Sequence, residues 1–439
     1  MRTNAYARPW RWAVTLGLLL TASIPSGAQT LDSLVHLAIE KYPSVEAARI
    51  AIRQADARAR GALAWEPPKA GLDISMLPPS NPNPFARGET MLMVEQEIPV
   101  FGRNRAMARA EGIGADIGRA AVLKEERELR GRVEREYYTL WLLDRRDEVN
   151  AKGREHANLL AKTAETRYAN NRGTQSEIYT VSIESERLLM ERKEIAEERA
   201  ESLGRLNLLL GRPEGTPAEI PGVLPMPELP PFDSLAPAID GHPALREMER
   251  MAAMSGAEAD AQKEMLKPML MLRGGIGYMP EGHPVREGTI FSMSNESMMG
   301  MEPHVDHVAL AVGAMISIPL ASWSRSGPES AAEVHTLEAS RKLLERDAMR
   351  ADMLAELRSA YSRARRAALR ISFYKQTQLP MLDRSLESIV ADYTNNRATF
   401  SSVIDAYHMP MMAEMDLYMQ EMEYAMAFSM ITELTGGRP

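Results

Sequence analysis

The sequence contains no cysteine, which excludes disulfide bonds and thiolate metal sites. A lipid anchor on an N-terminal cysteine is excluded for the same reason. Basic residues are not in excess, because the formal net charge is −8. The chain therefore has no basic surface typical of nucleic-acid binding, and we expect no nucleic-acid partner. Beyond the N-terminus it also lacks a long apolar run, so we expect no membrane-spanning helix.

Residues 1–28 are interpreted as a cleaved secretory signal peptide. Three arginines come before or at the start of the apolar segment 12–22, and Ser26, Gly27 and Ala28 offer small side chains for cleavage. The apolar segment is too short to span a bilayer as a helix. The mature protein is therefore expected in an exported compartment, either free or crossing a membrane as strands.

One segment of the chain occurs twice. Residues 168–181 read YANNRGTQSEIYTV, and residues 393–406 read YTNNRATFSSVIDA. Each copy lies between two long runs of helix-forming residues with few prolines, which predicts two helical hairpins with related tips. Asn171 and Asn396 suit the turns, because Asn tolerates the left-handed conformation better than other residues except Gly. The duplication indicates one architecture built from two halves.

Four short segments show the period of two that is typical of strands with one apolar face. They are residues 70–77, 91–98, 269–278 and 307–318, and the second alternates least clearly. Their lengths match those of tilted strands that cross a bilayer. Four strands cannot close a barrel, and open edges are not tolerated in lipid, so several chains must combine their strands. Three chains would supply twelve strands, enough for a lumen.

The remaining segments are predicted to be helical, with one linker between the halves. A helix over residues 31–64 is expected to bend at Pro43, and glycines in the next helix indicate close packing against a neighbour. The predicted division of the chain is a signal peptide at 1–28, a first repeat at 29–212 with its hairpin at 103–210, a linker at 213–231 with seven prolines, and a second repeat at 232–436 with its hairpin at 328–434, interrupted only at Pro380.

The order of these elements, the duplication, the leader and both tips resemble the TolC family of outer-membrane efflux proteins over essentially the whole mature chain. The family's tip pattern, Tyr-x-x-Gly followed by an acid and Val-Leu-Asp-Ala, is similar to Tyr393-Thr394-Asn395-Asn396 with Val403-Ile404-Asp405-Ala406. Asn stands here in place of the tip Gly. The resemblance implies a mainly α fold with a transmembrane β-barrel contribution: two tandem helix-strand-strand-hairpin repeats, assembled as a homotrimer with a twelve-stranded barrel and an α-helical tunnel.

The resemblance also implies a function and its partners. The chain would be the passive exit duct of a tripartite exporter, set in outer-membrane lipid with its tunnel in the periplasm, and it would contact a periplasmic adaptor protein linked to an inner-membrane pump of the RND type. Neither an enzymatic activity nor a cofactor is expected. The implied docking turns are Asn170, Asn171, Arg172, Gly173, Asn395, Asn396, Arg397 and Ala398.

A constriction is implied at Tyr393, Glu177 and Asp405, although the acid that the family pattern places at Ser402 and the Arg of some members at Ala398 are missing. A simpler interpretation is that the tip residues are only turn formers and helix caps. Asp405, near a helix start, would then complement only the helix macrodipole.

Thirty methionines are more than this fold requires. One group forms a stripe along the last helix, at residues 411, 415, 419, 422, 426 and 430. Another lies between the last two predicted strands, where the candidate metal ligands are Met293, Met298, Met299, Met301, His304 and His307. Thioethers select Cu(I), and imidazole also suits copper, so export of copper, silver or another heavy metal is one hypothesis. Packing is the alternative, because Met fills irregular gaps well; a general drug or small-molecule duct is then the alternative function.

Two further classes of protein are alternatives. A soluble periplasmic coiled-coil scaffold that binds metal would explain the helices and the methionines, but it would leave four amphipathic strands without a role. An enzyme is not expected, because the chain has no phosphate-binding glycine loop, no zinc-protease helix motif and no nucleophile elbow.

Overall fold

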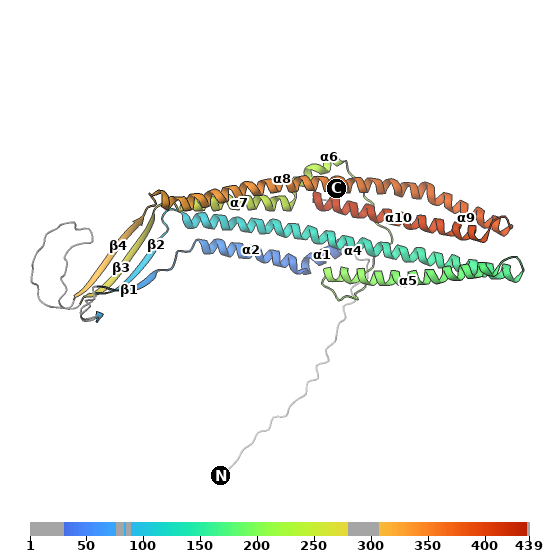
Figure 1. The fold of residues 1–439 in the computed structure, drawn as a ribbon, viewed down its shortest axis with the longest axis horizontal. Coiled ribbons are helices and arrows are strands. Elements are labelled where there is room, and N and C mark those ends of the chain that lie inside the picture. Colours follow the sequence, from blue (N-terminus) through green and yellow to red (C-terminus); the bar gives the residue numbers. More distant parts are fainter. Residues whose placement is uncertain (1–29, 76–82, 85–88, 280–306, 437–439) are drawn as a thin grey trace, which may run out of the picture.

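A computed structural model describes residues 30–75, 83–84, 89–279 and 307–436 of the chain. The molecule is long and thin, with a small sheet at one end and two helical hairpin tips at the other (Figure 1). The predicted signal peptide and most of the segment between the last two strands lie outside the described residues.

Each half of the chain has the order helix, strand, strand, helical hairpin, as predicted. The first half contains α1 (Leu31–Lys41), α2 (Pro43–Ala62), β1 (Lys69–Ser75), β2 (Glu89–Ile98), α4 (Arg103–Ala169) and α5 (Gln175–Leu209). The second half contains α6 (Phe232–Leu235), a 3₁₀ turn (Ala236–Gly241), α7 (Pro243–Glu264), β3 (Met269–Met279), β4 (His307–Ser317), α8 (Ser322–Phe373), a π-helical turn (Tyr374–Gln378), α9 (Leu379–Thr394) and α10 (Phe400–Thr435).

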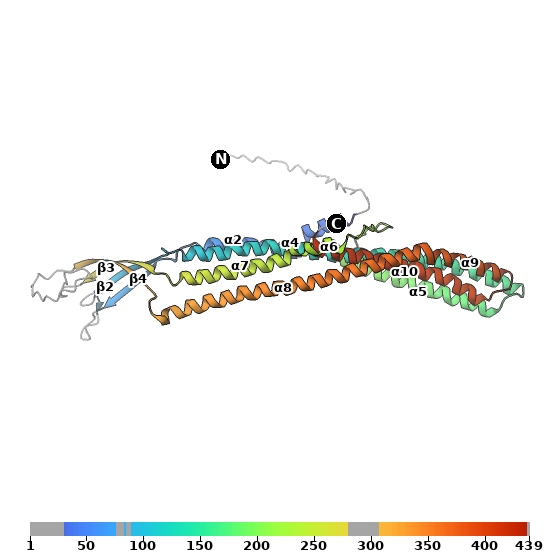
Figure 2. The same cartoon turned by 90° about the horizontal axis from the view of Figure 1, so that it is seen from above.

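The long helices form the frame against which the shorter helices pack. Helices α2 and α5 follow one another along α4, and α7 and α10 follow one another along the row of α8 and α9 (Figure 1). Viewed from above, these helices form a shallow slab, and α8 diverges from α4 toward the sheet (Figure 2). Helix α4 contacts α2 and α5 of its own half and α7 and α10 of the other. The two halves therefore pack through α4.

Close packing between α2 and α4 agrees with the prediction from the glycines. A Cβ placed on Gly118 would lie 2.8 Å from Cγ1 of Ile52, and one on Gly114 would lie 3.3 Å from the Cβ of Ala55. Glycine at both positions lets the backbones approach, at a cost of about 1 kcal/mol each in helix propensity. Gly112 has nothing within 4 Å of its Cβ position among the described residues, so close packing against α2 does not explain the glycine at this position.

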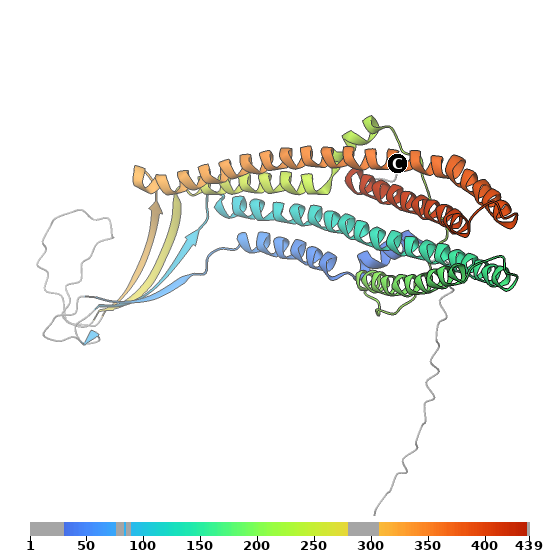
Figure 3. The same ribbon diagram turned by 45° about the vertical axis from the view of Figure 1, so that its right-hand side comes forward.

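The sheet is antiparallel in the order β1-β2-β3-β4, and it curves away from the helices (Figure 3). Leu72, Leu92, Ile276 and Leu310 form one row across all four strands. These four side chains are 55–77% exposed, so the sheet presents an apolar face to its surroundings. Within the described part of the chain, β1 and β4 are edge strands with one side unpaired.

Two prolines lie in or beside the second long helix; the α-helix is interrupted beside Pro380, as predicted, but it starts earlier than predicted. Pro380 lacks an N–H, so the carbonyl four residues earlier loses its helical partner; the chain absorbs this loss as the π turn and continues as α9. Helix α8 begins at Ser322, six residues before the predicted start, and Pro328 lies within it. Ser324, whose carbonyl loses its bond to Pro328, is exposed, so water can replace that bond.

The segment between the halves is irregular from Gly211 to Pro231 but is held at several points. Nδ2 of Asn207 donates to the carbonyls of Glu214 and Thr216 at 2.7 and 2.8 Å. Nε1 of Trp141 donates to the carbonyl of Gly222 at 3.3 Å, and the hydroxyl of Tyr424 donates to the carbonyl of Pro227. Helices of both halves therefore fix the linker.

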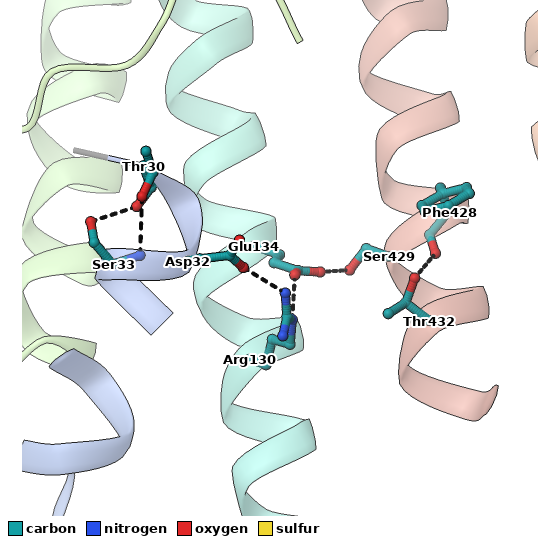
Figure 4. Close-up of polar contacts among 8 residues, drawn as sticks. All are labelled: Thr30, Asp32, Ser33, Arg130, Glu134, Phe428, Ser429 and Thr432. Carbon is teal, nitrogen blue, oxygen red and sulfur yellow. Dashed lines mark hydrogen bonds and ion pairs between the residues drawn. The ribbon is translucent and has the colours of Figure 1, made fainter. Parts of the chain in front are cut away.

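An ion network around a buried carboxylate joins the start of the described chain to both halves (Figure 4). Arg130 of α4 bonds Asp32 of α1 at 2.9 Å and Glu134 of α4 at 2.8 Å. The carboxylate of Glu134, which is 5% exposed, also accepts a hydrogen bond from the hydroxyl of Ser429 in α10. The buried charge is thus paired and hydrogen-bonded, as a buried carboxylate requires.

Helix α7 begins at a histidine cap. Nδ1 of His242 accepts a hydrogen bond from the backbone N–H of Ala244 at 3.2 Å, which requires a neutral ring. Burial, together with the positive charges of Arg127 and Lys124, lowers the pKa of His242 to about 4. The ring is therefore neutral at pH 7 and can act as the cap acceptor.

Candidate functional site at the hairpin tips

Both hairpin tips turn through an asparagine in the left-handed conformation, as the sequence predicted. Asn171 has φ 55° and Asn396 has φ 57°. In the first tip the N–H of Arg172 bonds the carbonyl of Arg167 at 2.8 Å, and the N–H of Asn171 bonds the carbonyl of Tyr168 at 3.0 Å. The second tip repeats both bonds with the same lengths. This pattern is the Schellman ending of a helix, and it satisfies carbonyls that would otherwise be left free.

The first Asn of each tip acts as a cap. Nδ2 of Asn170 donates to the carbonyl of Thr166 at 2.8 Å, and Nδ2 of Asn395 donates to that of Ala391 at 2.9 Å. These contacts agree with the simpler interpretation of the two residues. Both side chains are also exposed, as docking to a partner would require, and a docking role stays a prediction.

The return helices start with threonine caps. Oγ1 of Thr174 accepts from the N–H of Glu177 at 3.3 Å, and Oγ1 of Thr399 accepts from the N–H of Ser402 at 3.3 Å. Ser402, where the family pattern has an acid, adds a hydroxyl bond to Thr399 at 2.8 Å. Serine here therefore completes the cap, which explains why the turn forms without the missing acid.

Arg167 joins the two tips. Its guanidinium lies over the ring of Tyr393, with Cζ 4.3 Å from the ring centroid, and Nη2 donates to Oδ1 of Asn396 at 3.1 Å. The same nitrogen bonds the carbonyl of Arg172 in its own tip at 3.1 Å. One side chain thus holds both turns, through a cation–π contact and charge-assisted hydrogen bonds.

Tyr393 and Glu177, two of the three residues predicted for the constriction, meet beside Arg167. Tyr393 is 5% exposed, and it packs against Phe400 with ring centroids 5.8 Å apart. Burial, with the negative charge of Glu177 as a further cause, raises the pKa of Tyr393, so its hydroxyl stays protonated. That hydroxyl and Oε2 of Glu177 are buried, and neither has a hydrogen-bond partner among the described residues.

The third predicted residue, Asp405, lies apart from this group. It is exposed on α10, and none of the hydrogen bonds or ion pairs found between described residues includes it. The single chain therefore brings together Tyr393 and Glu177 but not Asp405. Sequence reasoning missed Arg167, because its partners in the other tip lie 226 and 229 residues away.

Gly173 shows why the two tips differ in sequence. A Cβ there would lie 2.9 Å from Oε2 of Glu177 and 3.0 Å from the Cβ of Arg167. A larger residue there would have to displace the Glu177 carboxylate and would crowd the Cβ of Arg167. In the second tip the matching residue is Ala398, which packs on the apolar cluster of Tyr393 and its neighbours. The remaining predicted docking residues, Asn171, Arg172, Asn396 and Arg397, are exposed.

A second polar cluster, which the sequence did not indicate, lies between α4, α5 and α10. It surrounds a cavity of about 20 Å³, room for about one water molecule. Nε2 of His408 lies 3.2 Å from Oε1 of Glu184, while Nδ1 of His156 is buried without a partner among the described residues. Burial also lowers the pKa of His156. Met411, the first residue of the predicted stripe, fills the space beside Gly153.

Most of the predicted metal ligands lie outside the described residues. Met293, Met298, Met299, Met301 and His304 lie outside the described residues, and His307 starts β4 opposite Met279. Across residues 30–75, 83–84, 89–279 and 307–436, no three His, Asp or Glu side chains are arranged to hold a metal ion. The methionine stripe of α10 packs in part, since Met422, Met426 and Met430 contact the two large apolar clusters.

Comparison with solved structures identifies the fold. CusC, described as forming a transmembrane channel, superposes with a TM-score of 0.74 and 16% identity over 94% of this chain and 93% of its own. The chain has the TolC fold. The Campylobacter jejuni CmeC outer membrane channel matches this TolC fold with a TM-score of 0.72 and 13% identity, over 99% and 94% of the two chains.

A third match to the TolC fold is the outer membrane protein VceC of Vibrio cholerae, with a TM-score of 0.70 and 17% identity over 93% and 96% of the two chains. All three identities are low, so the likeness concerns the fold. No protein-family model matches the sequence. A search of curated proteins found no match either. Among the helices of the described ranges, none is both long enough and apolar enough to cross a membrane.

Proposed function

We propose that three copies of this chain form an outer-membrane channel, which serves as the passive exit duct of a tripartite efflux system. The observation that carries the proposal is the sheet. One face carries exposed leucine, isoleucine or valine side chains on every strand, and within the described ranges β1 and β4 each have one edge without a partner strand. Lipid tolerates such a face but not such edges, so the edges must be paired by further copies. Three copies of four strands close a twelve-stranded barrel.

Aromatic side chains at the base of the sheet support a membrane position. Trp65, Phe101 and Trp323 are 59%, 47% and 83% exposed, and all three lie where strands meet helices. Aromatic residues are enriched at the level where a membrane barrel leaves the hydrocarbon. In this proposal the long helices extend from this level into the periplasm, a compartment that agrees with the export signal predicted at residues 1–28.

The tips support contact with an adaptor protein. They are the parts of the body farthest from the sheet, and their exposed residues are mainly Asn and Arg, which suit hydrogen bonds and ion pairs with a partner (Figure 1). In this proposal the adaptor binds the tip turns, and the group of Arg167, Tyr393 and Glu177 holds the tunnel closed. The pump in the inner membrane supplies the energy, since the duct is passive.

The soluble scaffold is disfavoured by a specific observation. Val308, Leu310 and Val312 of β4 are 73–77% exposed, and a sheet with such an edge strand would aggregate in water. For the substrate, export of heavy-metal ions and export of drugs or other small molecules are the two alternatives.

Membrane fractionation followed by conductance recording tests the proposal. The full chain, expressed with its own leader, should enter the outer-membrane fraction and require detergent for extraction. Purified protein should migrate as a trimer before heating and should give discrete K⁺ conductance steps in planar bilayers. Recovery in the soluble fraction, or a membrane protein without conductance, would contradict it.

A further inference from the structure

The two faces of the sheet differ in which kind of apolar side chain they carry. Each strand pair keeps a constant register, so alternate residues share a face across all four strands. Among the described side chains, every Leu, Ile and Val of the strands lies on one face. Every methionine whose side chain is described lies on the other: Met91, Met93, Met269, Met271 and Met315.

This separation is not what packing alone predicts. Met, Leu, Ile and Val have similar hydrophobicity, so a side chain chosen only to fill apolar space would occur on both faces. The methionine face instead accepts thioethers and excludes branched hydrocarbons. Its other residues are small, acidic or basic, including Asp73, Glu95, Glu97 and Arg273. What distinguishes Met from Leu is its sulfur, a soft ligand that selects ions such as Cu(I).

Glycines and alanines leave room for two of these methionines. Met93 lies opposite Gly275, and the next residue across is Ala311. A Cβ on Gly275 would lie 3.1 Å from Cγ of Met93 and 3.5 Å from Cγ of Met91. The thioethers therefore lie over bare backbone, and they are the largest side chains in their rows.

A second pair lies toward the helical end of the sheet. Met271 and Met315 are directly opposite one another on β3 and β4, so their Cβ atoms are about 5 Å apart. Glu97 is the neighbour of Met271 on the other side. Between the two pairs lies the ion pair of Glu95 and Arg273, and Glu97 is paired with Arg103 at 3.5 Å. Asp73, directly opposite Met91, is then the acid that adds negative charge beside the sulfurs.

Resting on the channel function proposed above, we propose that the methionine face lines the barrel lumen and conducts soft monovalent cations, Cu(I) or Ag(I), by transient thioether contacts. The apolar face meets lipid, so its opposite must face the lumen. Conduction needs binding that is weak and spread over several sites, which neutral thioethers at successive levels provide. Thiolates would bind such ions much more tightly, and this chain has none.

Silver is the probe, because Ag⁺ shares the softness of Cu(I) without its redox chemistry. K⁺ currents through the purified full-length trimer are recorded in nitrate salts, with Ag⁺ added stepwise. We expect Ag⁺ to block or interrupt the current. A variant with Met91, Met93, Met271 and Met315 changed to Leu should need about tenfold more Ag⁺ for the same block. Leu conserves the volume, so the K⁺ conductance should be unchanged.

Two controls make the result specific. Met381, Met409 and Met412 on α9 and α10 are 56–67% exposed, and changing them to Leu should leave the Ag⁺ block as it was. Block by the lipophilic cation tetraphenylphosphonium should survive in the four-residue variant, since Leu keeps the apolar character. Equal Ag⁺ block in wild type and the four-residue variant, with normal K⁺ current in both, overturns the methionine proposal alone. Absence of K⁺ current from the wild type overturns the channel function and this proposal together.

Discussion

Replacing Arg167 with Ala should weaken the contact between the two tips far more than replacing any other basic residue of the tips with Ala. The side chain contributes a cation–π contact with Tyr393 and a charge-assisted hydrogen bond to Asn396. For a half-exposed site each is worth about 1 kcal/mol, so the two tips should lose about 2 kcal/mol of mutual stabilisation. That corresponds to an approximately 30-fold rise in the population of the opened tip.

Hydrogen exchange at the tip amides measures this population directly. The N–H groups of Asn396 and Arg397 close the second turn, so their protection should fall by about 30-fold in the variant. In bilayers the same variant should show a larger mean conductance, because the closed arrangement of Tyr393 is less favoured. Amides in the middle of α4 should keep their protection, which separates tip opening from general unfolding.

Arg172→Ala is the matched control. Arg172 lies in the same turn and carries the same charge, but its side chain is exposed and only its backbone contacts Arg167. Arg167→Lys should give an intermediate loss, because it keeps the charge but not the planar fork that reaches Asn396. If Arg167→Ala and Arg172→Ala loosened the tip equally, the effect would be one of net charge, and the contacts described here would not hold the tips together.

Three further predictions concern the body and the sheet. His242→Asn keeps a cap acceptor but removes the group whose pKa is depressed to about 4. As the pH falls from about 6.5 to 4, the wild type should therefore lose about 3 kcal/mol more stability than the variant, with no difference above pH 7. Equal acid sensitivity of the two proteins in thermal melts would contradict this. Val312→Arg places a charge on the apolar face and should cost about 2–4 kcal/mol and lower trimer yield, whereas Ala309→Arg on the other face should assemble normally. Gly118→Ala should destabilise the protein by about 1 kcal/mol through overlap with α2, whereas Gly112→Ala should stabilise it by about 1 kcal/mol. If both variants changed the free energy of unfolding in the same direction, the packing explanation would be refuted.

The sequence predicted those features that depend on local pattern. The left-handed Asn171 and Asn396 followed from a repeated motif between helices, and three strands followed from alternation. The fourth, β2, was less clear because Glu95, Gln96 and Glu97 are consecutive. In the structure Glu95 pairs with Arg273, Gln96 donates to the carbonyl of Glu66, and Glu97 pairs with Arg103, so each polar side chain has a partner that only the folded chain supplies.

Features that depend on distant partners were not predictable. Arg167 lies one residue before the repeated motif, and nothing near it in sequence marks its contact with the other tip. His156 and His408 line one cavity only because α4 and α10 pack together there. Pro380 interrupts the α-helix as predicted, but local sequence does not show that the interruption takes the form of a π turn.

The unequal tips have a mechanical consequence. Arg167 of the first repeat corresponds to Asp392 of the second, so only the joint within a chain has the arginine over a tyrosine ring. In a ring of three chains the six hairpins would therefore meet at two kinds of joint in alternation. At the joints between chains Asp392 would approach the neighbour's first tip, where Tyr168 is 48% exposed. Such a ring would dilate as three stiff pairs of hairpins joined by three more compliant contacts, rather than as six equivalent hairpins.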